Sequence, residues 1–332
     1  RRESMIITQT PLRISFAGGL TDFADFYERE DGLVVSAAID KYIFVIINER
    51  FDDRIYINYS KREAVDHPDE IEHDLIREAL RLTGVTRGVE ITTLTDIPSE
   101  GSGLGSSSSI TVGLLNALYA YCGNPQPTEK LARDACEIEI ERCGQPIGKQ
   151  DQYIAAYGGL CGFTFRPGGV EVERLGLADG HAERLSDSLL LFYTNKTRKA
   201  ETILREQKAN MTGKFALVKE IKSVAQSARS ALAAGEIDRM GELLDRGWTW
   251  KYKMSGLVSN DEIDTMYRKA RDAGATGGKV CGAGGGGFLL LCCTESSRHR
   301  VRDALSGYRE LPFNLERDGT KVIFNMRRQV SK

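Results

Sequence analysis

The sequence predicts an α+β protein with two domains, and three observations support this class. The chain has 332 residues, of which 41% are hydrophobic, so it can bury a sizeable core and exceeds the usual length of one domain. Period-two strand patterns dominate its first half. Helical periodicity dominates the part after residue 198. We place the boundary so that the two domains cover residues 5–187 and 188–332.

The first strand is expected at residues 5–16, where apolar residues alternate with Arg13 and Ser15. This alternation places Arg13 on the polar face of the strand. The same patterns predict the other elements of the first domain: strands at 33–39, 42–49, 54–60, 88–98, 161–166 and 170–175, and helices at 71–84 and 126–143.

The second domain is expected to begin with a buried strand at residues 189–194. Its remaining elements follow from helical spacing and from the glycines that interrupt it: helices at 199–211, 212–234, 236–253 and 260–273, a strand at 288–293, a helix through 305, and strands near 309–314 and 320–326.

Residues 101–109, GSGLGSSSS, join a strand to a helix whose apolar positions recur at three- and four-residue spacing. Glycines let a backbone approach a ligand closely, and a helix N-terminus attracts anions because its first amides lack intrahelical partners. We therefore interpret this segment as a phosphate-binding loop rather than a flexible Gly/Ser linker. The expected ligands are Gly101, Ser102, Gly103, Leu104, Gly105, Ser106, Ser107 and Ser108.

Three glutamates lie in the predicted helix 126–143. Glu137 and Glu141 are four residues apart and share a face, whereas Glu139 points elsewhere. A charged helical face is usually solvated, so this pattern alone predicts no function. Asp151 follows in the segment GKQDQYIAAYGG, where a carboxylate is presented at the mouth of a short apolar element.

Composition excludes several classes of function. The formal net charge of −2 provides no general attraction to nucleic acid or to a membrane, so neither is expected as a partner. The chain has no run of eighteen apolar residues and no signal-peptide pattern, so we expect a cytoplasmic protein whose natural start is Met5. The seven scattered cysteines predict reduced thiols, and the four histidines lie away from these motifs, which disfavours a zinc site or a Ser-His-Asp triad.

Two other segments partly match glycine motifs of nucleotide-binding proteins. Gly282, Gly284 and Gly287 match the spacing of a dinucleotide-binding fingerprint, but they precede a buried strand instead of opening a helix. We therefore expect a backbone elbow packed against another backbone or a ligand, and a dehydrogenase is disfavoured. The segment GQPIGKQ lacks the hydroxyl residue that follows the lysine of a P-loop.

Three segments resemble, in order and spacing, the motifs of the GHMP small-molecule kinases: PLRISFAGGLTD (11–22), PSEGSGLGSSSS (98–109) and KVCGAGGGGF (279–288). The resemblance spans nearly the whole chain. It implies an ATP-dependent kinase with an N-terminal α/β domain built on a mixed sheet. It also implies a C-terminal ferredoxin-like domain with extra helices, and an active site between the two domains.

The resemblance also implies roles for particular residues. Asp151 matches the acidic base, and Arg13 matches an arginine beside the base and the transferred phosphoryl group. Ser107 and Glu141 match the ligands of Mg²⁺. Asp22, which alone would be interpreted as a helix cap, matches an acidic residue that holds sugar hydroxyls.

Within the family, the chain most resembles kinases of heptose phosphates, through segments such as GKQDQYIAAYGG and YTNKTRKA. This implies phosphoryl transfer from ATP to the anomeric hydroxyl of D-glycero-D-manno-heptose 7-phosphate, by a monomer or homodimer. A fucokinase-like sugar 1-kinase and a non-catalytic sensor on the same scaffold remain alternatives. The expected acceptor contacts are Gly18, Gly19, Asp22, Lys41, Thr194, Arg198, Gly284 and Gly285.

The phosphate of the acceptor needs cations of its own. Lys196, Arg198 and Lys199 follow the strand 189–194, with Thr194 beside them, and arginine with hydroxyls is a suitable partner for a terminal phosphate. The alternative is a solvated helix start, where cations are mildly unfavourable. We therefore favour a phosphate site at this cluster.

Overall fold

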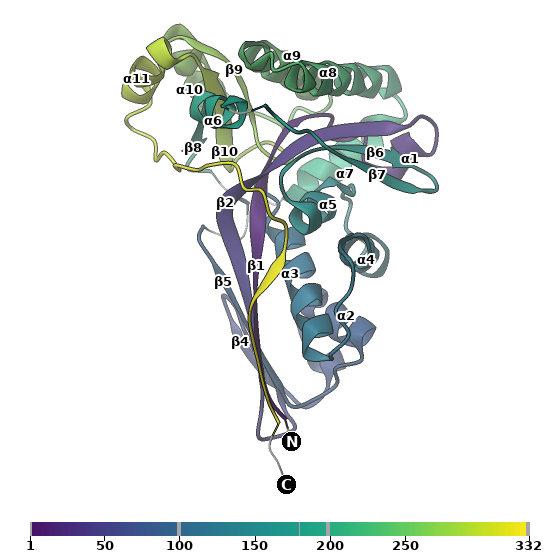
Figure 1. Cartoon of the computed structure of the whole chain (residues 1–332). Helices are drawn as coiled ribbons and strands as arrows, with labels where there is room; N and C mark the ends of the chain where they lie inside the picture. The colour runs from purple at the N-terminus through teal and green to yellow at the C-terminus, as the bar shows by residue number, and fades with distance from the viewer. Residues whose placement is uncertain (1, 98–100, 179, 197–199, 330–332) are drawn as a thin grey trace.

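The structure is a computed structural model that describes residues 2–97, 101–178, 180–196 and 200–329. It contains two sheets (Figure 1). The strands are β1 (Arg2–Ala17), β2 (Gly32–Glu49), β3 (Ile55–Asn58), β4 (Arg62–Val65), β5 (Val89–Thr95), β6 (Leu160–Arg166), β7 (Gly169–Arg174), β8 (Leu189–Tyr193), β9 (Ala275–Val280), β10 (Phe288–Cys293) and β11 (Lys321–Gln329).

The helices divide between the two parts of the chain. The α-helices are α1 (Ala24–Tyr27), α2 (Asp74–Thr83), α3 (Ser106–Tyr121), α4 (Thr128–Cys136), α5 (Gln150–Tyr157), α6 (His181–Ser188), α7 (Ala200–Met211), α8 (Phe215–Ala233), α9 (Met240–Tyr252), α10 (Asp261–Asp272) and α11 (Glu295–Ala304). Two short 3₁₀ helices, η1 (Pro68–Glu70) and η3 (Ile237–Arg239), and one π-helix, η2 (Glu137–Arg142), complete the set that the structure describes.

The larger sheet is mixed and has the order β11-β1-β2-β5-β3-β4, with β6 and β7 attached to β2. Its pairs are antiparallel except for β3 with β5. The two strands predicted at 33–39 and 42–49 are one continuous strand, β2. The register of β2 against β1 shifts between Pro11 and Leu12, so a bulge accounts for the break in the apolar pattern at Asp40 and Lys41.

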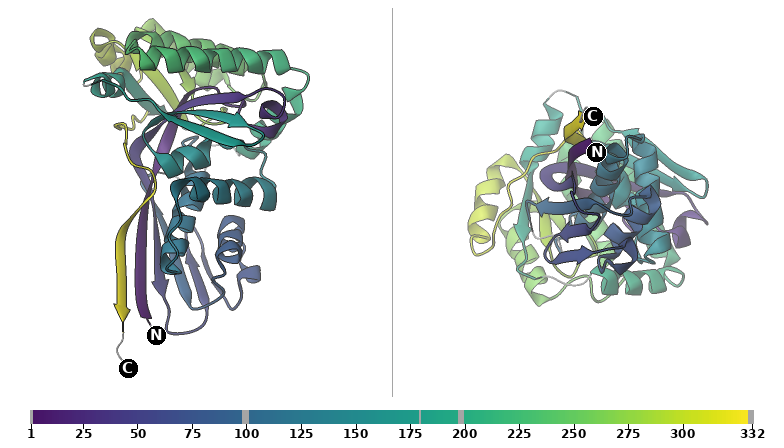
Figure 2. Two further views of the ribbon diagram at one scale, coloured as in Figure 1. Left: turned by 45° about the vertical axis from the view of Figure 1, so that its right-hand side comes forward. Right: turned by 90° about the horizontal axis from the view of Figure 1, so that it is seen from below.

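The smaller sheet has the antiparallel order β8-β10-β9. The strand expected near 309–314 is reduced to a single bridge between Phe192 and Glu310. Strand β11 lies within the range proposed for the second domain, yet it pairs with β1 and completes the edge of the larger sheet (Figures 1 and 2). The end of the described chain therefore belongs to the first sheet by its hydrogen bonds.

Helix α3 packs on β1 and β2 and occupies the centre of the main core (Figure 1). Leu114 and Leu118 are fully buried, as the sequence predicts, and the helix is buried on nearly every side. Because α3 is buried along most of its length, its N-terminus is held in a fixed position in the fold. Helices α8 and α9 lie side by side at one end of the molecule, opposite the end where β1 begins and β11 ends (Figure 2).

Candidate active site

The glycine loop ends directly at the N-terminus of α3, where Gly105 is the N-cap residue. Gly101, Gly103 and Gly105 have φ angles of 71°, 75° and 77°, the left-handed region that favours glycine. The Ser102 hydroxyl accepts a hydrogen bond from the amide of Leu104, at 3.3 Å. The loop therefore has a defined backbone conformation that leads into a fixed helix N-terminus, which suits a phosphate.

A second glycine segment packs against this loop. A Cβ on Gly103 would lie 2.6 Å from the carbonyl oxygen of Cys281, and a Cβ on Gly282 would lie 2.7 Å from Cα of Gly103. The amide of Phe288 donates to the carbonyl of Ser102, at 3.2 Å. The expected backbone elbow is confirmed, since the glycines before β10 pack against another backbone.

Glu139, rather than Glu141, faces the serines of the loop. Its carboxylate is fully buried and accepts hydrogen bonds from the hydroxyls of Ser107, at 2.9 Å, and Ser108, at 2.7 Å. Thr111 and Gln152 also donate to it. Burial raises the pKa of Glu139, while these hydrogen bonds oppose the rise. Glu141 is exposed, so the structure does not bring this predicted metal ligand to Ser107.

The buried face of the helix explains why Glu139 points inward. Leu131 and Ala135 of α4 and Glu139 of η2 recur every four residues, and all three are buried. Glu139 points elsewhere than Glu141, as the spacing predicts, and the resemblance therefore selected the wrong glutamate as the partner of Ser107. Ser107 is an exposed residue, in contrast to the buried Ser108.

Asp151 lies in the first turn of α5 and is held by Arg13 from β1. Arg13 Nε lies 2.7 Å from Oδ1 of Asp151, and Nη2 lies 2.7 Å from Oδ2. The third guanidinium nitrogen donates to the carbonyl of Gly103, at 2.5 Å. The Arg13 side chain is 5% exposed and that of Asp151 is 25% exposed, so the carboxylate keeps an open side next to the glycine loop.

Asp22 is buried and does not cap α1, the helix that follows it. Helix α1 begins two residues later and its N-cap is Phe23. The carboxylate of Asp22 instead accepts hydrogen bonds from the amide of Leu20, at 3.0 Å, and from that of Gln150, the first residue of α5, at 3.1 Å. Burial raises the pKa of Asp22 to about 6, even though both amides act in the opposite direction. The interpretation as a cap of the following helix is wrong.

Arg13, Asp22 and Asp151 line one small cavity of about 70 Å³. Two lysines that the sequence analysis did not select, Lys251 of α9 and Lys279 of β9, line it as well. The remaining lining residues come from both parts of the chain: Ser15, Gly19, Leu20, Phe23, Ile147, Gly148, Gln150, Leu204, Gln207, Gly282 and Ala283. The cavity thus lies where the two parts of the chain meet, as expected for the active site.

Lys279 could have been found from its sequence. It is the single charged residue in a strand of otherwise small or apolar residues, ATGGKV, and it is the first residue of the last family motif. Lys251 offers no comparable signal, because it lies near the end of a helix where a second lysine, Lys253, follows two residues later. Only the tertiary structure brings it to the cavity.

Of the other predicted acceptor contacts, some line the cavity and others make contacts elsewhere in the fold. Gly19 lines the cavity, but Gly18 packs against the backbone of Leu33. Thr194 is fully buried and donates to the carbonyl of Gly287, at 2.9 Å. Lys41 pairs with Asp40, at 2.9 Å.

Neither glycine of the last motif that was predicted to contact the acceptor lines the cavity. Gly284 packs against Val258, whose carbonyl accepts a hydrogen bond from the amide of Gly285. Both positions have positive φ angles, 98° and 74°, which explains why glycines occur there. Arg198 lies outside the described residues.

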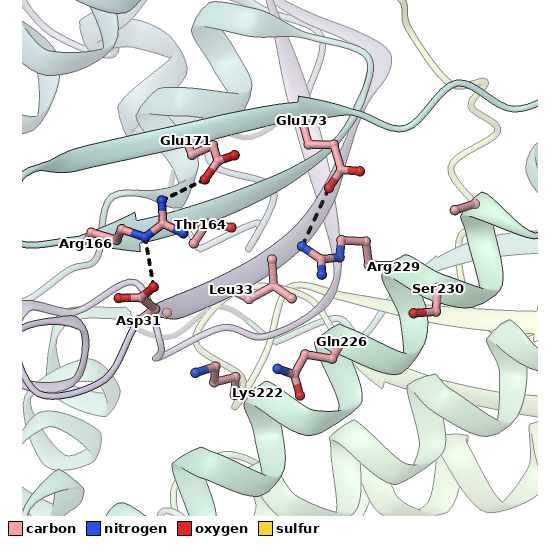
Figure 3. Close-up of a pocket in the computed structure, with 12 residues that line it drawn as sticks. Asp31, Leu33, Thr164, Arg166, Glu171, Glu173, Lys222, Gln226, Arg229 and Ser230 are labelled. Carbon is pink, nitrogen blue, oxygen red and sulfur yellow. Dashed lines mark hydrogen bonds and ion pairs between the residues drawn. The ribbon is translucent and has the colours of Figure 1, made fainter.

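A larger cavity of about 690 Å³ lies elsewhere, between the β6-β7 hairpin and α8 (Figure 3). Its charged side chains neutralise one another. Arg166 pairs with Asp31, at 2.8 Å, and with Glu171, at 2.7 Å, and Arg229 lies 3.7 Å from Glu173. None of the residues that the sequence selects lines this cavity.

Two further features concern metals and membranes. Within the described ranges, no group of three or more His, Cys, Asp or Glu side chains is arranged to hold a metal ion. A magnesium ion shared with phosphate oxygens needs only one or two protein ligands. No helix of the described chain has the length and apolar character needed to cross a membrane.

Comparison with known proteins gives a consistent result. Residues 72–159 match the GHMP kinases N terminal domain, and residues 228–309 match the GHMP kinases C terminal region. The D-glycero-alpha-D-manno-heptose 7-phosphate kinase of Campylobacter jejuni is 31% identical, and the match covers 95% of this chain and 98% of that protein.

Solved structures share the whole fold. A D-glycero-D-manno-heptose 1-phosphate kinase from Bacteroides thetaiotaomicron superposes with a TM-score of 0.79 at 27% identity, covering 98% of this chain and 100% of the other. A putative sugar kinase from Campylobacter jejuni superposes with a TM-score of 0.78 at 29% identity, covering 97% and 98% of the two chains. The two-domain fold expected from the sequence is confirmed.

Proposed function

Because this chain belongs to the GHMP kinase family, we propose that it transfers a phosphoryl group from ATP to the anomeric hydroxyl of a phosphorylated heptose. The expected acceptor is D-glycero-D-manno-heptose 7-phosphate, the substrate in the name of the Campylobacter jejuni relative. The expected product is the 1,7-bisphosphate.

One observation carries the proposal: a carboxylate, Asp151, is oriented by two hydrogen bonds from Arg13 beside the glycine loop and at the edge of the cavity. A general base must face the proton that it accepts and must be held in place. Asp151 has both properties, because one side of it is fixed by Arg13 and the other remains open. It would orient the acceptor hydroxyl and take its proton as the phosphoryl group is transferred.

The lining of the cavity suits an acceptor that has several hydroxyl groups. Gln150 Oε1, Gln207 Oε1 and Ser15 Oγ are shielded from solvent and have no hydrogen-bond partner among the residues that the structure describes. A buried polar atom without a partner is costly, so such atoms mark places where a ligand can complete the hydrogen bonding. Carboxamide oxygens accept hydrogen bonds, and sugar hydroxyls can donate them. The carboxylate of Asp22 adds another acceptor to the same cavity.

Ser107 and Glu139 are the residues that would hold Mg²⁺. Glu139 has no cation within ion-pair distance in the described part of the chain, and carboxylate and hydroxyl oxygens are the ligands that Mg²⁺ prefers. The ion would offset negative charge on the phosphates of ATP. The amides of the glycine loop, at residues 101–108, would bind those phosphates directly.

An ADP-release assay with several acceptors tests the function. The acceptors are D-glycero-D-manno-heptose 7-phosphate, the unphosphorylated heptose, fucose, galactose and mevalonate. We expect the highest kcat/KM for heptose 7-phosphate. A higher value for fucose would favour a fucokinase-like enzyme, and no ADP release with any acceptor would favour a sensor. We also expect a cytoplasmic monomer or homodimer, since both ATP and sugar phosphates are cytoplasmic metabolites.

A further inference from the structure

Two ammonium groups of the second domain line the active-site cavity without a carboxylate partner. Lys279 is 7% exposed, and its Nζ donates to the carbonyl of Ser15, at 2.9 Å. Lys251 donates to the carbonyl of Gly282. In the described part of the chain, no carboxylate lies within ion-pair distance of either ammonium group.

Each ammonium has three N–H donors, of which the protein uses one in each case. Burial without a counter-charge is unfavourable, and it lowers the pKa of Lys251 to about 7 and that of Lys279 to about 8. Arg13, the third cation of the cavity, is already neutralised by Asp151. An anion between the two lysines would supply both the missing charge and the missing acceptors.

The cations of the larger cavity, unlike these two lysines, have carboxylate partners. There Arg166 and Arg229 face carboxylates of the same cavity (Figure 3). Lys222 pairs with Glu30, at 2.9 Å. Cations that are neutralised in this way have no need of a ligand. The two lysines of the active-site cavity differ because their counter-charge is missing.

The cavity places both lysines beside predicted contacts of the acceptor. Gly19 and Asp22 line the same cavity as Lys251 and Lys279. Lys279 binds the carbonyl of Ser15 on β1, two residues beyond Arg13 in the direction of Gly19 and Asp22. Lys251 binds the carbonyl of Gly282, which packs against Gly103 of the glycine loop, so the test must separate the phosphate of the acceptor from the phosphates of ATP.

We propose that Lys251 and Lys279 together bind the phosphate group that the acceptor already carries, and so select a phosphorylated sugar. This inference rests on the proposed function. It assigns to these lysines the role that the sequence suggested for the cluster of Lys196, Arg198 and Lys199 with Thr194. The hydroxyl of Thr194 is already used within the fold.

The test compares two acceptors that differ only in the phosphate group: heptose 7-phosphate and the unphosphorylated heptose. Lys251→Met and Lys279→Met remove the charge but keep most of the length of the side chain. Lys253→Met is the matched control, because Lys253 is exposed and stacks on Trp250 near the end of the same helix. Charge-assisted hydrogen bonds contribute about 1.5–3 kcal/mol each, so we expect kcat/KM for heptose 7-phosphate to fall about 10- to 150-fold in each cavity variant. The value for unphosphorylated heptose should change less than about threefold, and the control should resemble the wild type.

Equal losses with both acceptors would overturn the inference, because they would assign the lysines to the transferred phosphoryl group. Lys251→Arg and Lys279→Arg keep the charge and should retain part of the preference. They also provide the test if a methionine variant fails to fold. If the wild type itself does not prefer the phosphorylated heptose, the proposed function fails. If it does and the variants keep the wild-type preference, only this inference fails.

Discussion

Arg13 and Asp151 form a two-point ion pair in which both carboxylate oxygens lie 2.7 Å from a guanidinium nitrogen. The pair connects β1 to the first turn of α5 and engages both oxygens of the Asp151 carboxylate, which orients it. It also fixes the carboxylate next to Gly105, on which a Cβ would lie 3.5 Å from Oδ2 of Asp151. The candidate base and the phosphate-binding loop are therefore held next to each other by Arg13.

Asp151→Asn should abolish most turnover while ATP still binds. The substitution keeps the size of the side chain but removes the charge that accepts the proton, and general-base catalysis contributes about 10²- to 10⁴-fold. Steady-state ADP release should fall within or beyond this range, and ATP affinity measured by calorimetry should change less than about threefold. Turnover near that of the wild type would remove Asp151 as the base.

Glu139→Gln should weaken the response to Mg²⁺, and Glu141→Gln should not. Glu139 bonds directly to Ser107, whereas Glu141 is exposed two residues further along η2. We expect the Mg²⁺ concentration for half-maximal rate to rise about tenfold or more in the first variant, because one charged oxygen ligand is lost. A Mg²⁺ titration at fixed ATP measures this. A shift in Glu141→Gln alone would restore the original assignment.

Asp22 should make the protein less stable as pH rises through the acidic range. Its pKa is raised from 3.8 to about 6 in the folded protein, so the folded state holds the proton more tightly than the unfolded state does. The resulting stabilisation is complete below pH 3.8 and is lost as pH rises through about 6. The difference corresponds to about 3 kcal/mol.

Urea unfolding of the wild type and of Asp22→Asn at several pH values measures this effect. The free energy of unfolding of the wild type should fall by about 3 kcal/mol relative to the variant between about pH 3.5 and pH 6.5. If the free energies of unfolding of the wild type and the variant changed in parallel with pH, Asp22 would have its ordinary pKa in the folded protein.

Gly103→Ala should be more destabilising than Gly84→Ala. Both glycines have positive φ, 75° and 74°, but a Cβ on Gly103 would meet the carbonyl of Cys281, whereas nothing lies within 4 Å of one on Gly84. We expect a loss of about 1 kcal/mol for Gly84→Ala and about 2–4 kcal/mol for Gly103→Ala, since overpacking adds to backbone strain. Equal losses in thermal or urea unfolding would show that the two glycine segments do not pack closely.

Much of this architecture could be predicted from local sequence patterns. Alternation along residues 5–16 and helical spacing after the glycine loop are local signals, and both elements form where they are expected. The resemblance to the family selected Arg13, Asp22 and Asp151 from the sequence, and all three line the cavity.

Other features depend on properties that no local pattern contains. A match to a family motif does not show which of Glu139 and Glu141 faces Ser107. The pairing of β11 with β1 joins residues more than 300 positions apart, and the backbone of β11 completes a sheet edge. Lys251 reaches the cavity only through the packing of α9 against β9 and β1.

The most direct test of the central claim is the ³¹P NMR spectrum of the product formed from ATP and D-glycero-D-manno-heptose 7-phosphate. We predict a second sugar-phosphate signal that is coupled to the anomeric proton, appears at the rate of ADP release, and is absent with Asp151→Asn. ADP release without this signal, or a new phosphate on another carbon, would contradict the proposed transfer to the anomeric hydroxyl.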